Sequence, residues 1–454
     1  MYSSSARIDP RHRSKAGWRA PAAFLPVLLI AAVSLSPQKN NFPRKNLFGN
    51  GLTVVTQMDD ASSITVLEIL IGGGTQGEPA GLKGLSYLTT RLALEIPDQA
   101  KAQALMEQAA RYMMTSKGDY SVIHIECLSD YLDDTLGVFV SILRDPLFSN
   151  MRIDRVKGYM NSQRKIESDD NLNIGQLAHL RTFLDHLGYG GSIYGETASL
   201  EKIKGRDIQS FYGSHVIPGN MSLIAISDLE TEKLNAILLK HFGSFPSAEK
   251  KAASSETQTG PPSSSASGGG ETVIERETTQ SLVSLGFALP GISAKNYVAA
   301  TLLEALIGKG PGSRLWPIRT EKRLAYNVNA RATFMREGGV FEAYMETDAT
   351  KKDAARDALK TVIRETWEKG IATDELAEVK TFVRADFLRS NETKARRAET
   401  LGLFEGCGLG YEFFQKFFDE LNALTLDEVN LYVREFLNPD KAALILVGPK
   451  SISR

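Results

Sequence analysis

The chain has 454 residues, of which 42% are hydrophobic and 24% are charged. This composition is typical of globular proteins and excludes a disordered chain, a collagen-like fibre and a protein with many membrane spans. The 53 basic and 54 acidic residues leave a net charge of -1, which gives no electrostatic reason to expect nucleic-acid binding. The two cysteines are too few for a disulfide scaffold or a cysteine-rich zinc module, and the length predicts roughly two to four domains.

The histidines are spaced too widely for a local zinc motif. Two imidazoles that share one metal on a helix stand about four residues apart, and no two histidines of this chain are three to five residues apart. The sequence therefore has no local histidine pair that could hold zinc. The six histidines are His12, His124, His179, His186, His215 and His241.

The N-terminus has the pattern of an export signal. Five basic residues and one acidic residue, Asp9, occupy the first 20 positions, and an apolar run follows from Pro21 to Ser36. This order predicts a signal peptide over residues 1–36, with an uncleaved N-terminal membrane anchor as the alternative. A mitochondrial presequence is disfavoured because those segments lack an unbroken apolar block. We therefore expect an exported chain, periplasmic or secreted.

Apolar periodicity predicts a mixture of strands and helices along the rest of the chain. In the first half, strands are expected at 52–57, 63–74 and 120–127, a helix at 81–95, a pair of helices within 132–165, and a helix, turn and strand within 205–229. In the second half, strands are expected at 280–289 and 338–347, a helix at 296–308, a pair of helices within 355–390, and a helix, turn and strand within 425–449.

The two series of elements repeat one another. Val156-Lys157 corresponds to Val379-Lys380 at a shift of 223 residues, and Pro218 corresponds to Pro439 at a shift of 221. Two registers that agree within two residues predict a duplicated domain. Because strands and helices do not alternate strictly, we expect the α+β class, with helices packed on a largely antiparallel sheet in each of two homologous domains.

A Ser-, Gly- and Pro-rich tract separates the two series. Residues 249–272 show no apolar periodicity, and such a tract buries too little surface to offset the entropy lost on ordering. We expect a flexible linker there, between a first domain at 37–248 and a second at 273–454.

Several short phrases occur in an order that is known from one family. They are GLTVV at a strand start, GGGTQGEPAGLKGL before the first long helix, PGNMSLIAISD, and SRLWPIRTEKRLAYNV in the second half. Over residues 46–448 the chain resembles the insulinase and pitrilysin-like family of zinc metallopeptidases. The resemblance implies paired homologous α+β domains.

The zinc motif of that family is degenerate in this chain. Active members carry H-x-x-E-H on the helix after the Gly-rich turn, where the histidines hold zinc and the glutamate serves as general base. The resemblance places Gly84 and Leu88 at the two histidine positions and Tyr87 at the glutamate position. The third ligand, a later glutamate in the family, falls at or near Gln163. These residues cannot do the chemistry, so the resemblance implies a chain that binds no metal and is inactive alone.

A second family pattern, R-x-x-x-x-L-A-Y, is intact in this chain: Arg319, Leu324, Ala325 and Tyr326 are all present, and Arg319 and Tyr326 are seven residues apart. The resemblance implies that both contact substrate. A phenol can donate to the oxyanion on a scissile carbonyl, and a guanidinium can hold a backbone carbonyl or a terminal carboxylate. Taken singly, Arg319 also fits a solvated cation near a helix C-terminus, and Tyr326 fits a tyrosine packed beside Val328 at a strand start.

Two functions follow from the resemblance. The first is the non-catalytic, substrate-binding subunit of an exported zinc endopeptidase, which cleaves peptides or unfolded proteins together with a homologous H-x-x-E-H chain that carries the zinc. Its sheet edges would hold a peptide as an added strand. The second is a purely structural or assembly subunit, like the core proteins of the cytochrome bc1 complex in the same family. The export signal and the Arg/Tyr pair favour the first.

Other chemically active side chains are expected to be structural. His179 and His186 fit a pair on a helix surface better than a metal site. His124 lies in an alternating strand and is expected to be packed or hydrogen-bonded. Cys127 and Cys407 are expected to be buried free thiols, with a disulfide between the halves as the alternative.

Overall fold

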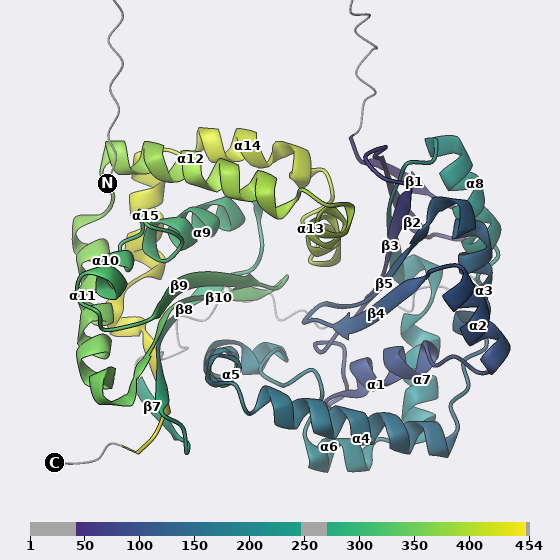
Figure 1. Cartoon of the computed structure of the whole chain (residues 1–454), viewed down its shortest axis with the longest axis horizontal. Helices are drawn as coiled ribbons and strands as arrows, with labels where there is room; N and C mark the ends of the chain where they lie inside the picture. Colours follow the sequence, from purple (N-terminus) through teal and green to yellow (C-terminus); the bar gives the residue numbers. More distant parts are fainter. Residues whose placement is uncertain (1–41, 247–269, 451–454) are drawn as a thin grey trace, which may run out of the picture. The chain divides into compact units, whose positions relative to one another are not determined.

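Two sheets carry the fold in the computed structural model, which describes residues 42–246 and 270–450. The first sheet has six strands: β1 (Arg44–Leu47), β2 (Thr53–Met58), β3 (Ile64–Gly72), β4 (Arg111–Ser116), β5 (Tyr120–Leu128) and β6 (Met221–Ser227). The second has five: β7 (Gly270–Glu275), β8 (Gln280–Pro290), β9 (Asn327–Phe334), β10 (Gly338–Asp348) and β11 (Ala443–Gly448). Their orders are β1-β2-β6-β3-β5-β4 and β7-β11-β8-β10-β9 (Figure 1).

The second sheet repeats the first. In each sheet one strand pair is parallel, β2 with β6 and β7 with β11, and the remaining pairs are antiparallel. The order β2-β6-β3-β5-β4 corresponds strand by strand to β7-β11-β8-β10-β9, and β1 is an addition at one edge. The expected α+β fold with two largely antiparallel sheets is therefore confirmed.

The helices lie close to where the periodicity predicts them. Those between the strands of the first half are α1 (Leu85–Ala93), α2 (Gln99–Glu107), α3 (Leu132–Arg144), α4 (Asn150–Glu167), α5 (Asn171–Leu184), α6 (Thr197–Lys202), α7 (Gly205–His215) and α8 (Thr231–Phe242). Those of the second half are α9 (Ala294–Ile307), α10 (Trp316–Thr320), α11 (Lys352–Lys369), α12 (Thr373–Ser390), α13 (Lys394–Gly406), α14 (Phe413–Ala423) and α15 (Leu426–Phe436). One expected boundary is wrong: the helix predicted from residue 81 begins at Leu85.

The predicted signal or anchor at 1–36 and most of the predicted linker lie outside the described residues. β7 begins at Gly270, so the last part of the range 249–272 is strand rather than linker. Within 42–246 and 270–450, no helix combines the length and the apolar character that crossing a membrane requires.

Two equivalent lysines show how closely the halves match. Lys157 Nζ on α4 donates to the carbonyl of Ile203 at 2.7 Å. Lys380 Nζ on α12 donates to the carbonyl of Leu424 at 2.6 Å. Each acceptor directly precedes the N-terminal cap of the next helix, α7 or α15. The same lysine therefore holds the same turn in both halves, as the repeat in the sequence predicts.

The two halves exchange one helix each. α5, from the first half, packs on β8, β10 and β11 of the second sheet. α13, from the second half, packs on β3 and β6 of the first sheet, and Figure 1 shows it beside these strands. The helices are equivalent in the repeat, since Asn171 and Lys394 are separated by 223 residues, the same shift that relates Lys157 to Lys380. In each sheet, one face is therefore covered by a helix from the other half.

Buried polar contacts fix the N-terminus of α13 on the first half. Lys394 is 6% exposed, and its Nζ donates to the carbonyls of Ser62 at 2.6 Å and Ile64 at 2.8 Å. One turn later, Arg397 forms an ion pair with Asp59. The apolar residues that follow on α13 join a buried cluster with the first sheet that includes Val66, Leu70, Ala398 and Leu401.

We expect Lys394→Ala to lower the free energy of unfolding by roughly 1–3 kcal/mol, because two backbone carbonyls in partly buried hydrogen bonds lose their charged donor. The measurement is the midpoint and slope of urea unfolding. Lys416→Ala, at an exposed position on α14, is the control and should leave the midpoint unchanged. Equal midpoints for the two variants would contradict the role given to Lys394.

Candidate functional site

The N-terminus of α1, where the resemblance places the degenerate zinc motif, is built on a glycine. Gly84 is the N-cap residue and has φ 92°, in the left-handed region that favours glycine. A Cβ at Gly84 would lie 3.0 Å from backbone atoms of Gly195 and Tyr194. This position therefore accepts no side chain without moving the loop that packs against it, and a histidine does not fit there.

A buried carboxylate closes the same helix end. Glu78 Oε1 accepts hydrogen bonds from the backbone N–H of Gly84 at 3.0 Å and of Ser86 at 2.9 Å. Within the described residues, its Oε2 is buried without a hydrogen-bond partner. Burial raises the pKa of Glu78 to about 7, against the opposing effect of the two backbone donors. Glu78 is not among the residues that the sequence pattern predicts for the site, although a carboxylate shortly before a helix start is a usable signal.

The other two positions of the degenerate motif are part of the apolar core. Leu88 is fully buried, and Tyr87 is 5% exposed with its ring edge-on to Tyr194 at 4.9 Å between centroids. Both belong to a cluster with Val156 and Met160 of α4. Burial, followed by the nearby Tyr159 and Tyr194, raises the pKa of Tyr87, so its phenol keeps its proton.

Gln163 is half-buried on α4, one turn after Met160. The nearest carboxylate on the same side of this helix, Glu167, accepts a hydrogen bond from the Ser192 hydroxyl at 2.6 Å. In the part of the chain that the structure describes, no group of three or more His, Cys, Asp and Glu side chains is placed to hold a metal ion. Gly84, Tyr87, Leu88 and Gln163 also do not fit zinc, since they offer neither an imidazole nor a carboxylate.

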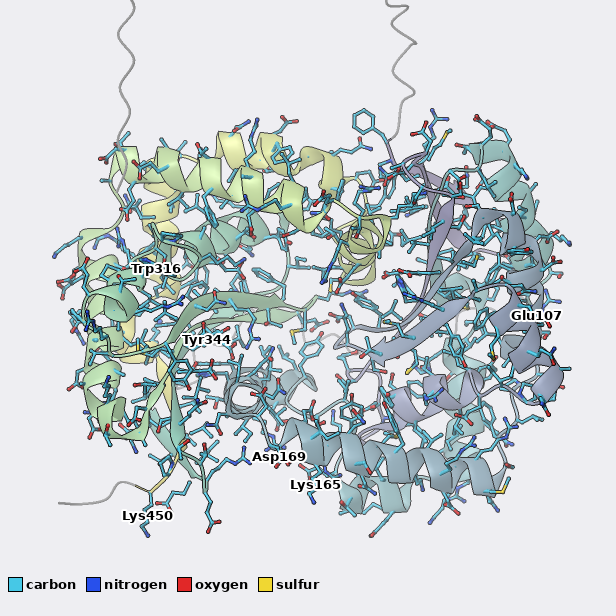
Figure 2. All side chains as sticks on the ribbon, in the orientation of Figure 1. Glu107, Lys165, Asp169, Trp316, Tyr344 and Lys450 are labelled. Atoms are coloured by element: carbon cyan, nitrogen blue, oxygen red, sulfur yellow. The ribbon has the colours of Figure 1, made fainter. Side chains whose placement is uncertain are left out.

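Arg319 and Tyr326 stand at the two ends of one surface segment. Arg319 is exposed in the last turn of α10, with its guanidinium 4.8 Å from the ring centre of Trp316, which Figure 2 labels. Tyr326 directly precedes β9 and is 44% exposed. Burial and then the carboxylates of Glu346 and Asp348 raise the pKa of Tyr326, so the phenol remains a hydrogen-bond donor. Contact of the pair with substrate stays a prediction.

His179 and His124 make structural contacts, and the surface position predicted for His179 is wrong. His179 is not on a helix surface: it is fully buried between α5 and the second sheet, where its Nε2 is 2.9 Å from Ser284 Oγ. Burial lowers the pKa of His179 to about 3, so it is neutral. His186 is exposed. His124 is hydrogen-bonded, as expected, and lies between Glu68 at 3.4 Å and Glu126 at 3.1 Å.

The cysteines are the buried free thiols that were expected. Cys127 lies in the core of the first sheet and Cys407 beside α13, and they form no disulfide. Burial raises the pKa of Cys127 to about 11 and that of Cys407 to about 12. Both thiols are therefore protonated and poor nucleophiles at neutral pH.

The fold and this site define the class of the protein: a duplicated metallopeptidase-type α+β fold in which the helix expected to bear the metal is an apolar core helix. Residues 53–186 match the family described as "Insulinase (Peptidase family M16)". Residues 202–383 match "Peptidase M16 inactive domain". The chain belongs to peptidase family M16 and is a member of the non-catalytic type.

Relatives and solved structures share this family or this fold. "Non-peptidase homolog YmxG" of Helicobacter pylori is 22% identical over 386 residues, which cover 84% of this chain and 87% of that protein. The crystal structure of a peptidase M16 inactive domain from Pseudomonas fluorescens has a TM-score of 0.79 and 20% identity, and the match covers 91% of this chain and 99% of that one.

Two further structures have the same fold, one as a chain of a multi-subunit complex and the other as part of a protease. A chain of Complex III2 from Candida albicans has a TM-score of 0.75 and 15% identity, and the match covers 89% of this chain and 95% of that one. The periplasmic protease PqqL from Escherichia coli has a TM-score of 0.73 and 13% identity, and the match covers 92% of this chain and 48% of PqqL. These likenesses establish the fold.

Substitution of Gly84 should show whether the loop contact excludes a side chain. Gly81 has φ 79° but nothing within 4 Å of a Cβ, so Gly81→Ala is a matched control for the backbone cost alone. We expect Gly81→Ala to cost about 1 kcal/mol of folding free energy, and Gly84→Ala to cost roughly 1–2 kcal/mol more because the Cβ meets backbone. Thermal and urea unfolding measure both. Equal losses would show that Gly84 is required for its φ alone.

Glu78 should make folding stability depend on pH. Its pKa is about 7 in the folded protein against an ordinary 4.5, so the unfolded chain loses this proton first and stability falls as pH rises from about 4.5 to about 7. The loss is on the order of 2–3 kcal/mol. Glu78→Gln keeps the Oε1 acceptor and removes the titration. Urea midpoints at about pH 5 and pH 8 should differ less for this variant than for the wild type; an unchanged difference would contradict the assignment.

Proposed function

We propose that this chain is the non-catalytic, substrate-binding subunit of an exported zinc endopeptidase. A homologous chain with H-x-x-E-H would supply the zinc, the metal-bound water and the general base. The observation that carries the proposal is the apolar core around Leu88 and Tyr87, combined with an exposed Arg319 and Tyr326. The metal position is closed, while the residues that the resemblance assigns to substrate remain at the surface.

The free edge of the first sheet supports binding of an extended peptide. Among the described strands, β4 pairs with β5 alone, and the hairpin bond from Lys117 N–H to Tyr120 O fixes which backbone groups point outward. By the antiparallel alternation, the N–H and C=O of Tyr112 and Met114 face away from β5. No hydrogen bond within the described residues uses these outward N–H groups. They are therefore available to an added strand.

The equivalent edge of the second sheet is closed. The outward N–H of Ala332 on β9 donates to the buried carboxylate of Glu304 on α9. The outward N–H of Ala330 donates to the side chain of Asn329 at 2.8 Å. A Cβ at Gly308, at the end of α9, would lie 2.0 Å from Ala330 N. An added strand would have to displace these contacts, so we assign peptide addition to β4.

Arg319 and Tyr326 would act on a peptide held in the partner's active site. The Tyr326 phenol would donate a hydrogen bond to the oxyanion that forms on the scissile carbonyl, and Arg319 would hold a neighbouring backbone carbonyl or a terminal carboxylate. The stack of Arg319 on Trp316 limits the freedom of the guanidinium before substrate arrives. We infer export to the periplasm or to the medium from the sequence pattern of residues 1–36.

Peptidase activity should appear only on mixing. We expect the isolated chain with added zinc to cleave no peptide, and the mixture with a homologous H-x-x-E-H chain to cleave unstructured peptides at a rate well above that of the partner alone. A quenched fluorescent peptide measures the rate. Zinc-dependent cleavage by the isolated chain would overturn the proposal.

Arg319→Ala and Tyr326→Phe in the mixture should lower turnover by about 10- to 100-fold, because each removes a donor to the developing charge. Neither should change the unfolding of this chain, since both side chains are exposed. Arg384→Ala, which also removes an arginine stacked on an aromatic ring, is the control and should leave turnover unchanged.

A structural role is the second candidate, favoured by the likeness to a chain of Complex III2. Affinity capture of the tagged chain from its own cell envelope separates the two. Recovery of a homologous zinc peptidase supports the proposal, whereas recovery of membrane electron-transfer subunits supports the structural role.

A further inference from the structure

A cavity lies beside the free edge of the first sheet. It has a volume of about 420 Å³ and opens between β4, β5 and the N-terminal half of α13. One wall comes from the first half and the other from the exchanged helix of the second half, where Arg396 and Glu399 line it. We call this cavity the β4 pocket.

The inner wall of the β4 pocket is acidic. Glu68 on β3 is 5% exposed, and its Oε1 lies 3.4 Å from Nδ1 of His124. Glu126 on β5 lies 3.1 Å from the other ring nitrogen, Nε2. Two carboxylates therefore share one imidazole, and at least one negative charge is left over in either protonation state of His124. Buried charges are weakly screened, so this excess acts strongly on a group that enters the pocket.

The rim of the pocket carries more positive than negative charge, all of it on exposed or partly exposed side chains. Arg396 and Lys117 approach the carboxylate of Glu399 at 3.0 and 3.9 Å. Arg111 on β4 lies across from Glu126, is exposed and makes no ion pair with another described residue. Water and salt screen these exposed charges more than those of the inner wall.

The pocket also has apolar surface, contributed by Met113, Tyr120 and Val122. The side chains of lysine and arginine combine an aliphatic stem with a charged head. The stem would lie on the apolar lining near the mouth, and the head would reach the carboxylates at the inner wall.

The register of β4 directs a side chain of an added strand into this pocket. Met113 pairs with His124, so both side chains lie on the same face of the sheet. Residues directly opposite one another in antiparallel strands also share a face. The residue of an added antiparallel strand that lies opposite Met113 would therefore point into the β4 pocket.

We propose that the β4 pocket selects a lysine or arginine side chain of the peptide that adds to β4, with Glu68 and Glu126 as its acceptors. The proposal rests on strand addition at β4 and adds the chemical class of the residue that is recognised. Arginine fits the pair of carboxylates best because its planar head offers several donors in fixed directions.

His124 makes this selection depend on pH. Burial opposes protonation of His124, but its hydrogen bonds to Glu68 and Glu126 outweigh this effect and raise its pKa. The charged groups that face it are Glu68, Glu126, Arg111, Lys117, Arg396 and Glu399. Protonated His124 occupies the two acceptors and repels a second cation. Binding of a basic side chain therefore strengthens as pH rises and His124 loses its proton.

The experiment compares two short extended peptides that differ only in one central residue, arginine or its neutral isostere citrulline. Binding to the full chain is measured by fluorescence anisotropy. We expect the arginine peptide to bind about tenfold more tightly. A third peptide, N-methylated at alternate backbone positions, tests strand addition itself, and we expect it not to bind.

Substitutions test whether the preference for arginine over citrulline arises from the β4 pocket. Glu126→Gln and Glu68→Gln should each reduce the tenfold ratio to about twofold and leave the citrulline affinity unchanged. Glu126 is partly exposed, so this variant keeps the test valid if Glu68→Gln fails to fold. Glu365→Gln, an exposed position on α11, is the control for the change in net charge and should keep the ratio. His124→Gln should abolish the rise in arginine affinity between about pH 5.5 and pH 8.

The outcomes separate this proposal from the proposed function. Equal affinity for the arginine and citrulline peptides, or tighter binding of the citrulline peptide, with no binding of the N-methylated peptide, would overturn the pocket proposal and keep strand addition. Equal binding of the N-methylated peptide, or no binding of any peptide, would overturn strand addition and the pocket proposal together.

Discussion

The exchange of α5 and α13 between the two sheets is the constraint on which the rest of the structure depends. Each sheet is covered on one face by helices of its own half, and on the other face by the helix from the opposite half. Lys394 and Arg397 attach α13 to the first half by polar contacts, and the apolar residues of α13 fill the sheet face behind them. The halves therefore stabilise one another, and the β4 pocket exists only because a helix of the second half forms one of its walls.

At equivalent positions, one half has the large side chain on the strand and the small one on the exchanged helix, and the other half has the reverse. Glu68 lies beside Ile224 in the first sheet, and Ser284 lies beside the equivalent Ile445 in the second. Where the strand carries the large Glu68, the exchanged helix carries Gly402, whose Cβ would lie 2.4 Å from that carboxylate. Where the strand carries the small Ser284, the exchanged helix carries His179. The larger side chain is on the strand in one half and on the helix in the other, and at this pair of equivalent contacts the charged residue is Glu68, which lines the β4 pocket.

The sequence predicts what depends on local pattern and misses what depends on long-range packing. Apolar alternation predicts β3 and β8, and the repeated Val-Lys pairs reveal the duplication, because both signals are carried by neighbouring residues. The exchange of α5 and α13 is not predictable in this way, since an apolar stripe specifies a buried face but not the sheet that buries it. The predicted surface position of His179 is wrong for that reason. The predicted start of α1 is too early because the helix begins after Gly84, whose left-handed conformation and contact with the loop around Tyr194 depend on the folded structure.

The apolar residues at the metal position are compatible with the proposed peptide binding at β4, because different parts of the fold carry the two features. A zinc site needs buried donors, and a buried polar group without its partner costs folding free energy. Tyr87 and Leu88 remove that cost by joining the core with α4. The register between β4 and β5 decides which backbone groups of β4 point outward. The identity of the buried residues of α1 does not set this register. A chain of this kind can therefore fill the metal position with core side chains and still keep an open strand edge at β4 beside a charged pocket.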